Sequence, residues 1–202
     1  MKQDKKVILM VCDGAFANDG INLLKDFVEL TFSEKGYSFI GKGRIDSNLT
    51  SMHARIPFDV IGKNPHILVL SIGSIGREEK GAQNSTFKDE YEKIIELIKS
   101  KTHAHIVLCS ISCLPFNFED EIYKVLEERN SIIRDISEKQ NLFFLDMAKI
   151  FKDKQERLIN DTEYDVRLCE EPEKLTQKGN LLFCMSIIGS LNKFGLIKEE
   201  EQ

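Results

Sequence analysis

The chain has 202 residues, of which 42% are hydrophobic and 30% charged, and its formal net charge is -5. This length and apolar content suffice to bury the core of one domain, and the acidic balance opposes wholesale nucleic-acid binding, which goes with a basic surplus. No apolar run approaches the roughly 20 residues of a membrane-spanning helix, and the run at 7–11 is too short for a signal peptide. We therefore expect a cytoplasmic protein with no membrane association, one domain over 1–202 with charged tails at about 1–5 and 198–202.

The first half of the chain alternates between apolar runs of strand length and segments of helical period. Strands are predicted at 6–11, 37–41 and 66–73, and helices at 21–32 and 87–99, the latter begun by a capping box at Thr86. The residues expected on the inner face of the first helix are Leu23, Leu24, Phe27, Val28 and Leu30. Those expected on the inner face of the second are Phe87, Tyr91, Ile94, Ile95 and Ile98.

The second half continues the same alternation. Strands are predicted at 105–112 and 141–147, a long helix lies between them at about 119–138, and Thr176 caps a last helix. The inner face of that last helix is expected to carry Leu181, Leu182, Met185, Ile188 and Leu191.

Strands rich in valine, isoleucine and leucine, with helices between them, indicate a parallel sheet covered on both faces. We predict an α/β protein, a three-layer α/β/α sandwich of about five strands in flavodoxin-like order. Ligands bind such sheets at the carboxyl ends of the strands, where the strand order reverses. This places the turn CDGAFAND after the first strand beside IGSIGREEKG after the third strand.

Four blocks of sequence resemble the SGNH (GDSL-type) hydrolases, a superfamily of α/β/α esterases and lipases, over nearly the whole chain. They are VILMVCDGAFANDG at 7–20, GKGRIDSNLTSMHARI at 41–56, DVIGKNPHILVLSIGSIG at 59–76 and EEPEKLTQKGNLLFCMSIIGSL at 170–191. In that family these blocks carry, in turn, Gly-Asp-Ser, a glycine-bearing loop, Gly-x-Asn-Asp, and Asp-x-x-His before a Leu-Thr-x-x-Gly helix start. The resemblance implies the same fold, with an order of strands like that of the SGNH hydrolases.

The family's catalytic residues are replaced at the matching positions. The nucleophilic serine falls at Gly14, after Cys12 and Asp13. The oxyanion-hole glycine falls at Asp46 or Ser47, and the asparagine of the third block falls at Ile75, after Gly73 and Ser74. In the last block the acid falls at Glu171 and the general base at Lys174.

These replacements favour a catalytically inactive domain, a pseudoenzyme that acts as a binding or scaffold module. Glycine offers no nucleophile, isoleucine cannot donate a hydrogen bond to an oxyanion, and a protonated lysine is a poor substitute for imidazole. The precedent is the OSK domain of the insect protein Oskar. That domain resembles the family, lacks its catalytic residues and binds RNA. The partner is left open between a protein and RNA.

RNA contact would need a clustered basic face, for which two segments offer candidates. They are Lys42, Arg44, Arg55, Arg167, Lys174 and Lys178. The alternative interpretation is that these side chains are scattered and solvated, and the negative net charge favours this interpretation.

The alternative function is an esterase or other acyl hydrolase with a rearranged active site. It would require Cys12 or Ser74 as the nucleophile and His53 as the base. The non-catalytic readings of these residues are a buried structural thiol for Cys12 and a turn residue for Ser74. Asp13 is expected to hold its own turn through backbone hydrogen bonds.

The sequence predicts no metal and no cofactor. The five cysteines are an odd number and include no Cys-x-x-Cys pair, which supports neither a disulfide framework nor a zinc site. Buried thiols in a reducing compartment are the expectation.

Overall fold

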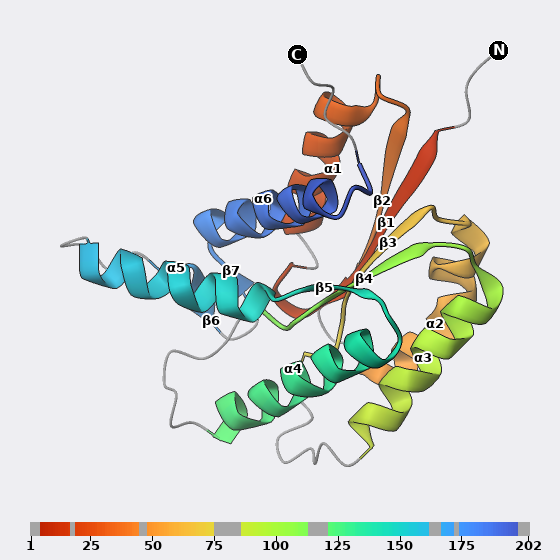
Figure 1. Ribbon diagram of the computed structural model, residues 1–202. Coiled ribbons are helices and arrows are strands. Elements are labelled where there is room, and N and C mark those ends of the chain that lie inside the picture. Colours follow the sequence, from red (N-terminus) through yellow and green to blue (C-terminus); the bar gives the residue numbers. More distant parts are fainter. Residues whose placement is uncertain are drawn as a thin grey trace.

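The protein is described by a computed structural model that covers residues 5–16, 19–44, 48–74, 86–112, 121–161, 167–171 and 174–197. Five parallel strands form one sheet in the order β2-β1-β3-β4-β5 (Figure 1). The strands are β1 (Lys6–Asp13), β2 (Tyr37–Arg44), β3 (Ile67–Ser71), β4 (His105–Cys109) and β5 (Phe143–Leu145). The predicted α/β class and flavodoxin-like strand order are confirmed.

In the described part of the chain, six α-helices cover the two faces of this sheet (Figure 1). They are α1 (Asp19–Phe32), α2 (Leu49–Asp59), α3 (Phe87–Lys101), α4 (Glu121–Lys139), α5 (Met147–Asp161) and α6 (Gln177–Lys193). Buried side chains of α1, α5 and α6 form one apolar cluster with the sheet, and those of α2, α3 and α4 form a second cluster on the other face. Within the described residues, no helix is both long and apolar enough to cross a bilayer.

Strand β1 divides its side chains between the two apolar clusters. Ile8, Met10 and Cys12 belong to the cluster under α1 and α6, whereas Leu9 and Val11 belong to the cluster under α2 and α3. This alternation follows from the two-residue period of a strand. Because both faces are buried, β1 has a near-continuous apolar sequence, and Asp13 at its end is a buried charge.

The inner face of α3 is as predicted, since Phe87, Tyr91, Ile94, Ile95 and Ile98 are all buried. Thr86 is the N-cap residue, but its side chain makes no capping hydrogen bond. The expected capping box is therefore wrong.

The predicted inner faces of α1 and α6 are partly wrong. In α1 the buried stripe contains Ile21, Leu24, Val28 and Phe32, at the three- and four-residue spacing of one helix face. A second apolar stripe beside it, predicted to be buried, is exposed: Leu23 by 37%, Phe27 by 40% and Leu30 by 87%. In α6 the same holds for Leu181 and Met185, whereas Ile188 and Leu191 are buried as predicted. The other buried apolar residues there are Phe183, Cys184 and Ile187.

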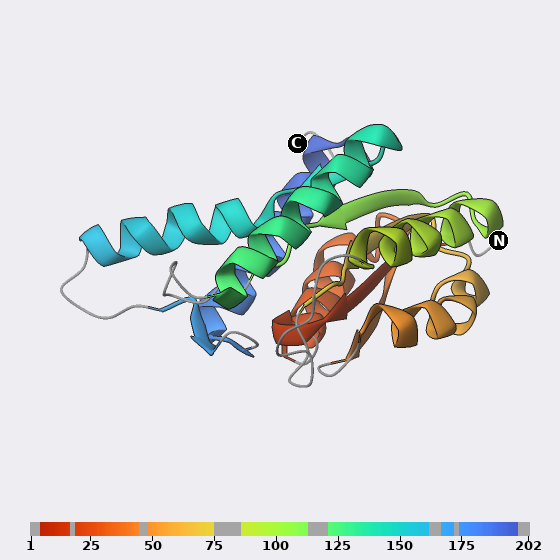
Figure 2. The same ribbon diagram turned by 90° about the horizontal axis from the view of Figure 1, so that it is seen from below.

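Two elements between β5 and α6 have no counterpart in the sequence prediction. Helix α5 projects beyond the sheet in both views (Figures 1 and 2), and much of its sequence is charged. A short antiparallel hairpin, β6 (Cys169–Glu171) and β7 (Lys174–Leu175), leads into α6. The hairpin is too short to show the strand periodicity that pattern analysis needs.

The start of α6 packs closely on the backbone that enters the hairpin. Thr176 Oγ1 accepts a hydrogen bond from the Gly179 N–H at 3.1 Å, and the Thr176 N–H donates to the Leu168 carbonyl oxygen at 2.9 Å. A β-carbon on Gly179 would lie 2.1 Å from that same Leu168 oxygen. Glycine at 179 therefore lets the helix and the hairpin segment meet.

Replacing Gly179 with alanine should lower the free energy of unfolding by about 1–3 kcal/mol, because the methyl group displaces backbone rather than a mobile side chain. Gly189→Ala in the same helix is the matched control, since a β-carbon there meets nothing within 4 Å. The control should gain up to about 1 kcal/mol from the higher helix propensity of alanine. Urea denaturation measures both, and equal effects of the two substitutions would contradict the packing account.

Candidate active site

The carboxyl ends of β1 and β3 meet where the strand order reverses, as predicted. β2 pairs with one side of β1 and β3 with the other, so the turn after β1 and the turn after β3 lie together. Asp13 ends β1, and Gly73 and Ser74 follow β3. This is the place at which parallel sheets of this type bind ligands.

The Asp13 carboxylate joins the two turns. Its Oδ2 accepts hydrogen bonds from the Gly73 N–H at 2.7 Å and from the Ser74 N–H at 3.2 Å. The Ser74 side chain also lowers the pKa of this carboxyl group. The expectation that Asp13 holds its own turn is wrong, because these partners belong to the turn after β3.

Ser74 fills the space that a side chain at position 14 would need. Gly14 has a left-handed backbone conformation, with φ +61°, and a β-carbon built on it would lie 3.0 Å from Ser74 Oγ and 3.1 Å from Ser74 Cβ. The turn after β1 therefore presents no side chain of its own at this point. A serine hydroxyl from the neighbouring strand end is present instead, partly exposed and in contact with a carboxylate.

Arg129 of α4 holds the same turn from the other side. Its Nη1 donates hydrogen bonds to the carbonyl oxygens of Gly73 at 2.9 Å and Ser74 at 3.1 Å. The guanidinium group lies 4.8 Å from the centre of the Phe87 ring, and only 5% of the residue is exposed. The N–H groups of Gly73 and Ser74 thus donate to the Asp13 carboxylate, and their carbonyl oxygens accept from the Arg129 guanidinium group.

Burial raises the pKa of the Asp13 carboxyl group from 3.8 to about 6. Removing a carboxylate from water disfavours its charged form. The hydrogen bonds from the Gly73 N–H, the Ser74 hydroxyl and the Ser74 N–H act in the opposite direction, as does the positive charge of Arg129. Burial outweighs them, and the group titrates close to neutral pH.

Cys12 and His53, the other two residues considered for catalysis, do not meet the requirements at this site. Cys12 is fully buried, and burial raises the pKa of its thiol well above 9.0, so the nucleophilic thiolate is disfavoured. His53 is exposed on α2. Within the described chain, no hydrogen bond joins His53 to Asp13 or Ser74.

Several positions that match the family's motifs fall where the structure gives little or no description. Asp46, Ser47, Ile75 and Gly76 lie outside the described residues. Glu171 is in β6, where only its backbone is described, and it is paired in register with the exposed Lys174 of β7.

The basic candidates for ligand binding are spread over several elements, with Lys42 and Arg44 both on β2. Lys42 and Arg55 lie on either side of Asp59, with Lys42 Nζ at 3.9 Å and Arg55 Nη2 at 2.6 Å from its carboxylate. Lys174 forms an ion pair with Glu170. Three further candidates are exposed: Arg44 at the end of β2, Arg167 in the segment before β6, and Lys178 in α6.

The sequence analysis missed the buried polar residues that support this edge of the sheet. Asn130 accepts the Ile111 N–H at 2.7 Å, and Ser110 Oγ accepts the Ala148 N–H at 2.8 Å. Arg129 and Asn130 lie between Leu126 and Ile133 on the stripe of α4 that faces the sheet. Polar residues on an otherwise apolar stripe were the available signal, because buried polar groups require specific partners.

No protein-family model matches the sequence, and a sequence search of curated proteins finds no match. Solved structures do match. The acetyl xylan esterase AlAXEase is 17% identical, with 91% of this chain and 99% of the esterase covered and a TM-score of 0.79. Axe2, an acetylxylan esterase from Geobacillus stearothermophilus, is 16% identical, with 95% and 96% covered and a TM-score of 0.76.

These neighbours correct the predicted function. The expectation of a catalytically inactive binding or scaffold module, RNA-binding in one version, is contradicted, because the matched structures are acetyl xylan esterases and fit the alternative of an acyl hydrolase. The physical reason lies at Gly14. The sequence shows only a missing side chain at this position, whereas in the structure the Ser74 hydroxyl group lies against it. The chain has the α/β fold of these esterases.

Proposed function

We propose that this protein hydrolyses carboxylic esters with Ser74 as the nucleophile and Asp13 as its general base. The observation that carries the proposal is the position of Ser74: its Oγ lies 3.0 Å from the point where a β-carbon on residue 14 would be, and its N–H donates to the Asp13 carboxylate at 3.2 Å. A hydroxyl group in contact with a base is the arrangement that nucleophilic catalysis requires.

The reaction proceeds in two steps that need only these two side chains and water. Ser74 Oγ attacks the carbonyl carbon of the ester while its proton passes to the Asp13 carboxylate. The protonated Asp13 then gives this proton to the leaving alkoxide as the ester bond breaks, which leaves the acyl group on Ser74. A water molecule, deprotonated by Asp13, attacks the acyl carbon. The bond from that carbon to Ser74 Oγ breaks, Asp13 returns the proton to Oγ, and the carboxylic acid is released.

Burial gives Asp13 the basicity that this role needs. A carboxylate with its ordinary pKa near 4 is a weak base, but a pKa of about 6 is close to the value of about 6.5 for free imidazole. Such a group is ionised at pH 7–8 and can still release the proton to a leaving group. This supports a carboxylate in the role that a histidine has in the usual serine–histidine pair.

Arg129 is a positioning residue in this scheme. Its two hydrogen bonds to the carbonyl oxygens of Gly73 and Ser74 fix the turn that carries the nucleophile. Its positive charge lowers the pKa of Asp13 and so keeps the base ionised near neutral pH.

The substrate we propose is an acetyl ester of a carbohydrate. The support comes from the two structural neighbours, which are acetyl xylan esterases and whose fold this chain shares over nearly its whole length.

Ser74→Ala should reduce the rate of acetyl ester hydrolysis by about a thousandfold or more, because it removes the attacking oxygen. The assay is the hydrolysis of p-nitrophenyl acetate and of acetylated xylooligosaccharides by the purified protein. Cys12→Ala and His53→Gln are the matched controls and should retain activity within about twofold. Retained activity in Ser74→Ala, or an equal loss in either control, would contradict the assignment.

Asp13→Asn should abolish hydrolysis and should stabilise the protein more at neutral pH than at acid pH. The pKa of Asp13 is raised in the folded state, so folding favours its protonated form, and the wild type gains stability as the pH falls from about 6 towards 3.8. Asparagine has no charge to bury at any pH. The stability of the variant relative to the wild type should therefore fall by roughly 2.5 kcal/mol between pH 7.5 and pH 4, at about 1.36 kcal/mol per pKa unit and with the unfolded carboxyl group already partly protonated at pH 4.

Urea denaturation of both proteins at the two pH values measures this difference. A difference that is independent of pH, or that grows towards pH 4, would show that Asp13 is not a buried ionised carboxylate at neutral pH.

A further inference from the structure

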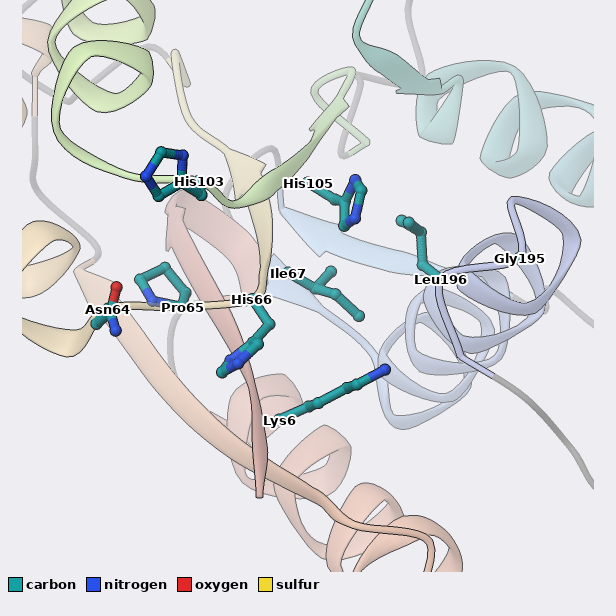
Figure 3. Close-up of a pocket in the computed structure, with 9 residues that line it drawn as sticks. All are labelled: Lys6, Asn64, Pro65, His66, Ile67, His103, His105, Gly195 and Leu196. Carbon is teal, nitrogen blue, oxygen red and sulfur yellow. The ribbon is translucent and has the colours of Figure 1, made fainter. Parts of the chain in front are cut away.

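A second site lies at the opposite, amino-terminal edge of the sheet. A cavity of about 380 Å³ opens there between the starts of β1, β3 and β4 and the end of α6 (Figure 3). Its lining residues are Lys6, Asn64, Pro65, His66, Ile67, His103, His105, Gly195 and Leu196. The volume lies in the range of about 300–1,000 Å³ typical of small-molecule sites.

The polar lining of this cavity consists mainly of side chains that can carry a positive charge. Three of the four histidines of the chain are present, together with Lys6, and none of the described lining residues is acidic. Figure 3 shows Lys6, His66 and His105 around one opening, with Ile67 behind them. Histidine clusters often bind metals, but within the described residues no three histidine, cysteine or acidic side chains are placed to hold a metal ion.

A hydrogen bond from the backbone leaves Nε2 as the donor atom of the neutral His66 ring. The Val7 N–H donates to His66 Nδ1 at 3.1 Å, which places the proton of the neutral ring on Nε2. The neighbouring backbone N–H groups of Lys6, His66 and His105 already donate to carbonyl oxygens at 2.7–2.9 Å. A ligand in this cavity would therefore be bound by side chains: the Lys6 ammonium group and the imidazole N–H groups.

Aromatic contacts hold the other side of the cavity in place. The ring of His105 lies edge-on to Phe143 at 6.4 Å, and Phe143 stacks on Phe194 at 4.9 Å. Lys6 Nζ lies 5.9 Å from the centre of the Tyr37 ring, and the Tyr37 hydroxyl donates to the Leu196 carbonyl oxygen at 3.4 Å. Apolar walls from Pro65, Ile67 and Leu196 complete the cavity.

We propose that this cavity binds a phosphate monoester of a small organic molecule, with the phosphoryl group among Lys6, His66 and His105 and the organic part against the apolar walls. A lysine ammonium group and imidazole N–H groups donate charge-assisted hydrogen bonds to phosphate oxygens. Among the described residues no carboxylate lines the cavity, so none of them would repel such an anion. The site is separate from Asp13 and Ser74, which lie at the other end of the same strands.

Nuclear magnetic resonance of the histidine rings tests this directly, with phenyl phosphate as the probe. At pH 6.5 the ring signals of His66 and His105 should shift in a saturable way, and that of His103, also in the lining, should shift less. His53 is exposed on α2 and serves as the internal control that should not move. Phenol at the same concentrations, and sodium chloride at the same ionic strength, should leave all four signals in place.

Substitutions locate the ligand. Lys6→Gln and His105→Gln should each weaken phenyl phosphate binding by about threefold or more, in line with the loss of a partly exposed charge contact. Lys5→Gln removes a neighbouring exposed charge that does not line the cavity and should change the affinity little. The proposal is overturned if His53 shifts with the others, if phenol binds as well as its phosphate ester, or if Lys5→Gln weakens binding as much as Lys6→Gln.

Discussion

The candidate site depends on the contact between the Asp13 carboxylate and the backbone N–H groups of Gly73 and Ser74. This contact ties the end of β1 to the turn after β3 and places the Ser74 hydroxyl beside a base. It also carries a cost, because the carboxylate is buried and its pKa rises to about 6. Arg129, which donates to the Gly73 carbonyl oxygen, reduces that cost because its positive charge lowers the pKa of Asp13. A buried pair of opposite charges such as Asp13 and Arg129 is weak evidence for stability, and strongly shifted pKa values are typical of functional sites.

Much of the fold could be predicted from the sequence. The strands are apolar runs buried on both faces, and the order of strands and helices leaves few topologies, so the meeting of the turns after β1 and β3 could be predicted. The inner face of α3 was clear because its apolar residues form one stripe. In α1 and α6 two apolar stripes lie side by side, and sequence alone does not say which faces the sheet. The exposed residues Leu30 and Met185 show the consequence.

The chemistry of the site was harder to predict, because it depends on residues that are distant in the sequence. Gly14 and Ser74 are 60 residues apart along the chain, and only their positions in space show that the second fills the place of a side chain on the first. Position-by-position comparison with the family's motifs therefore led to the wrong inference of an inactive domain. Arg129 was missed for a similar reason, since its partners are the backbone carbonyls of another element.

The most direct test of the central claim is to locate the acyl group during turnover. The protein is mixed with p-nitrophenyl acetate, quenched with acid within the first turnovers, digested and examined by mass spectrometry. The account predicts an acetyl group on the peptide that contains Ser74, at that residue, and an increased amount of it in a variant that slows deacylation. Acetyl transfer to a different side chain, or turnover with no covalent intermediate at all, would contradict it.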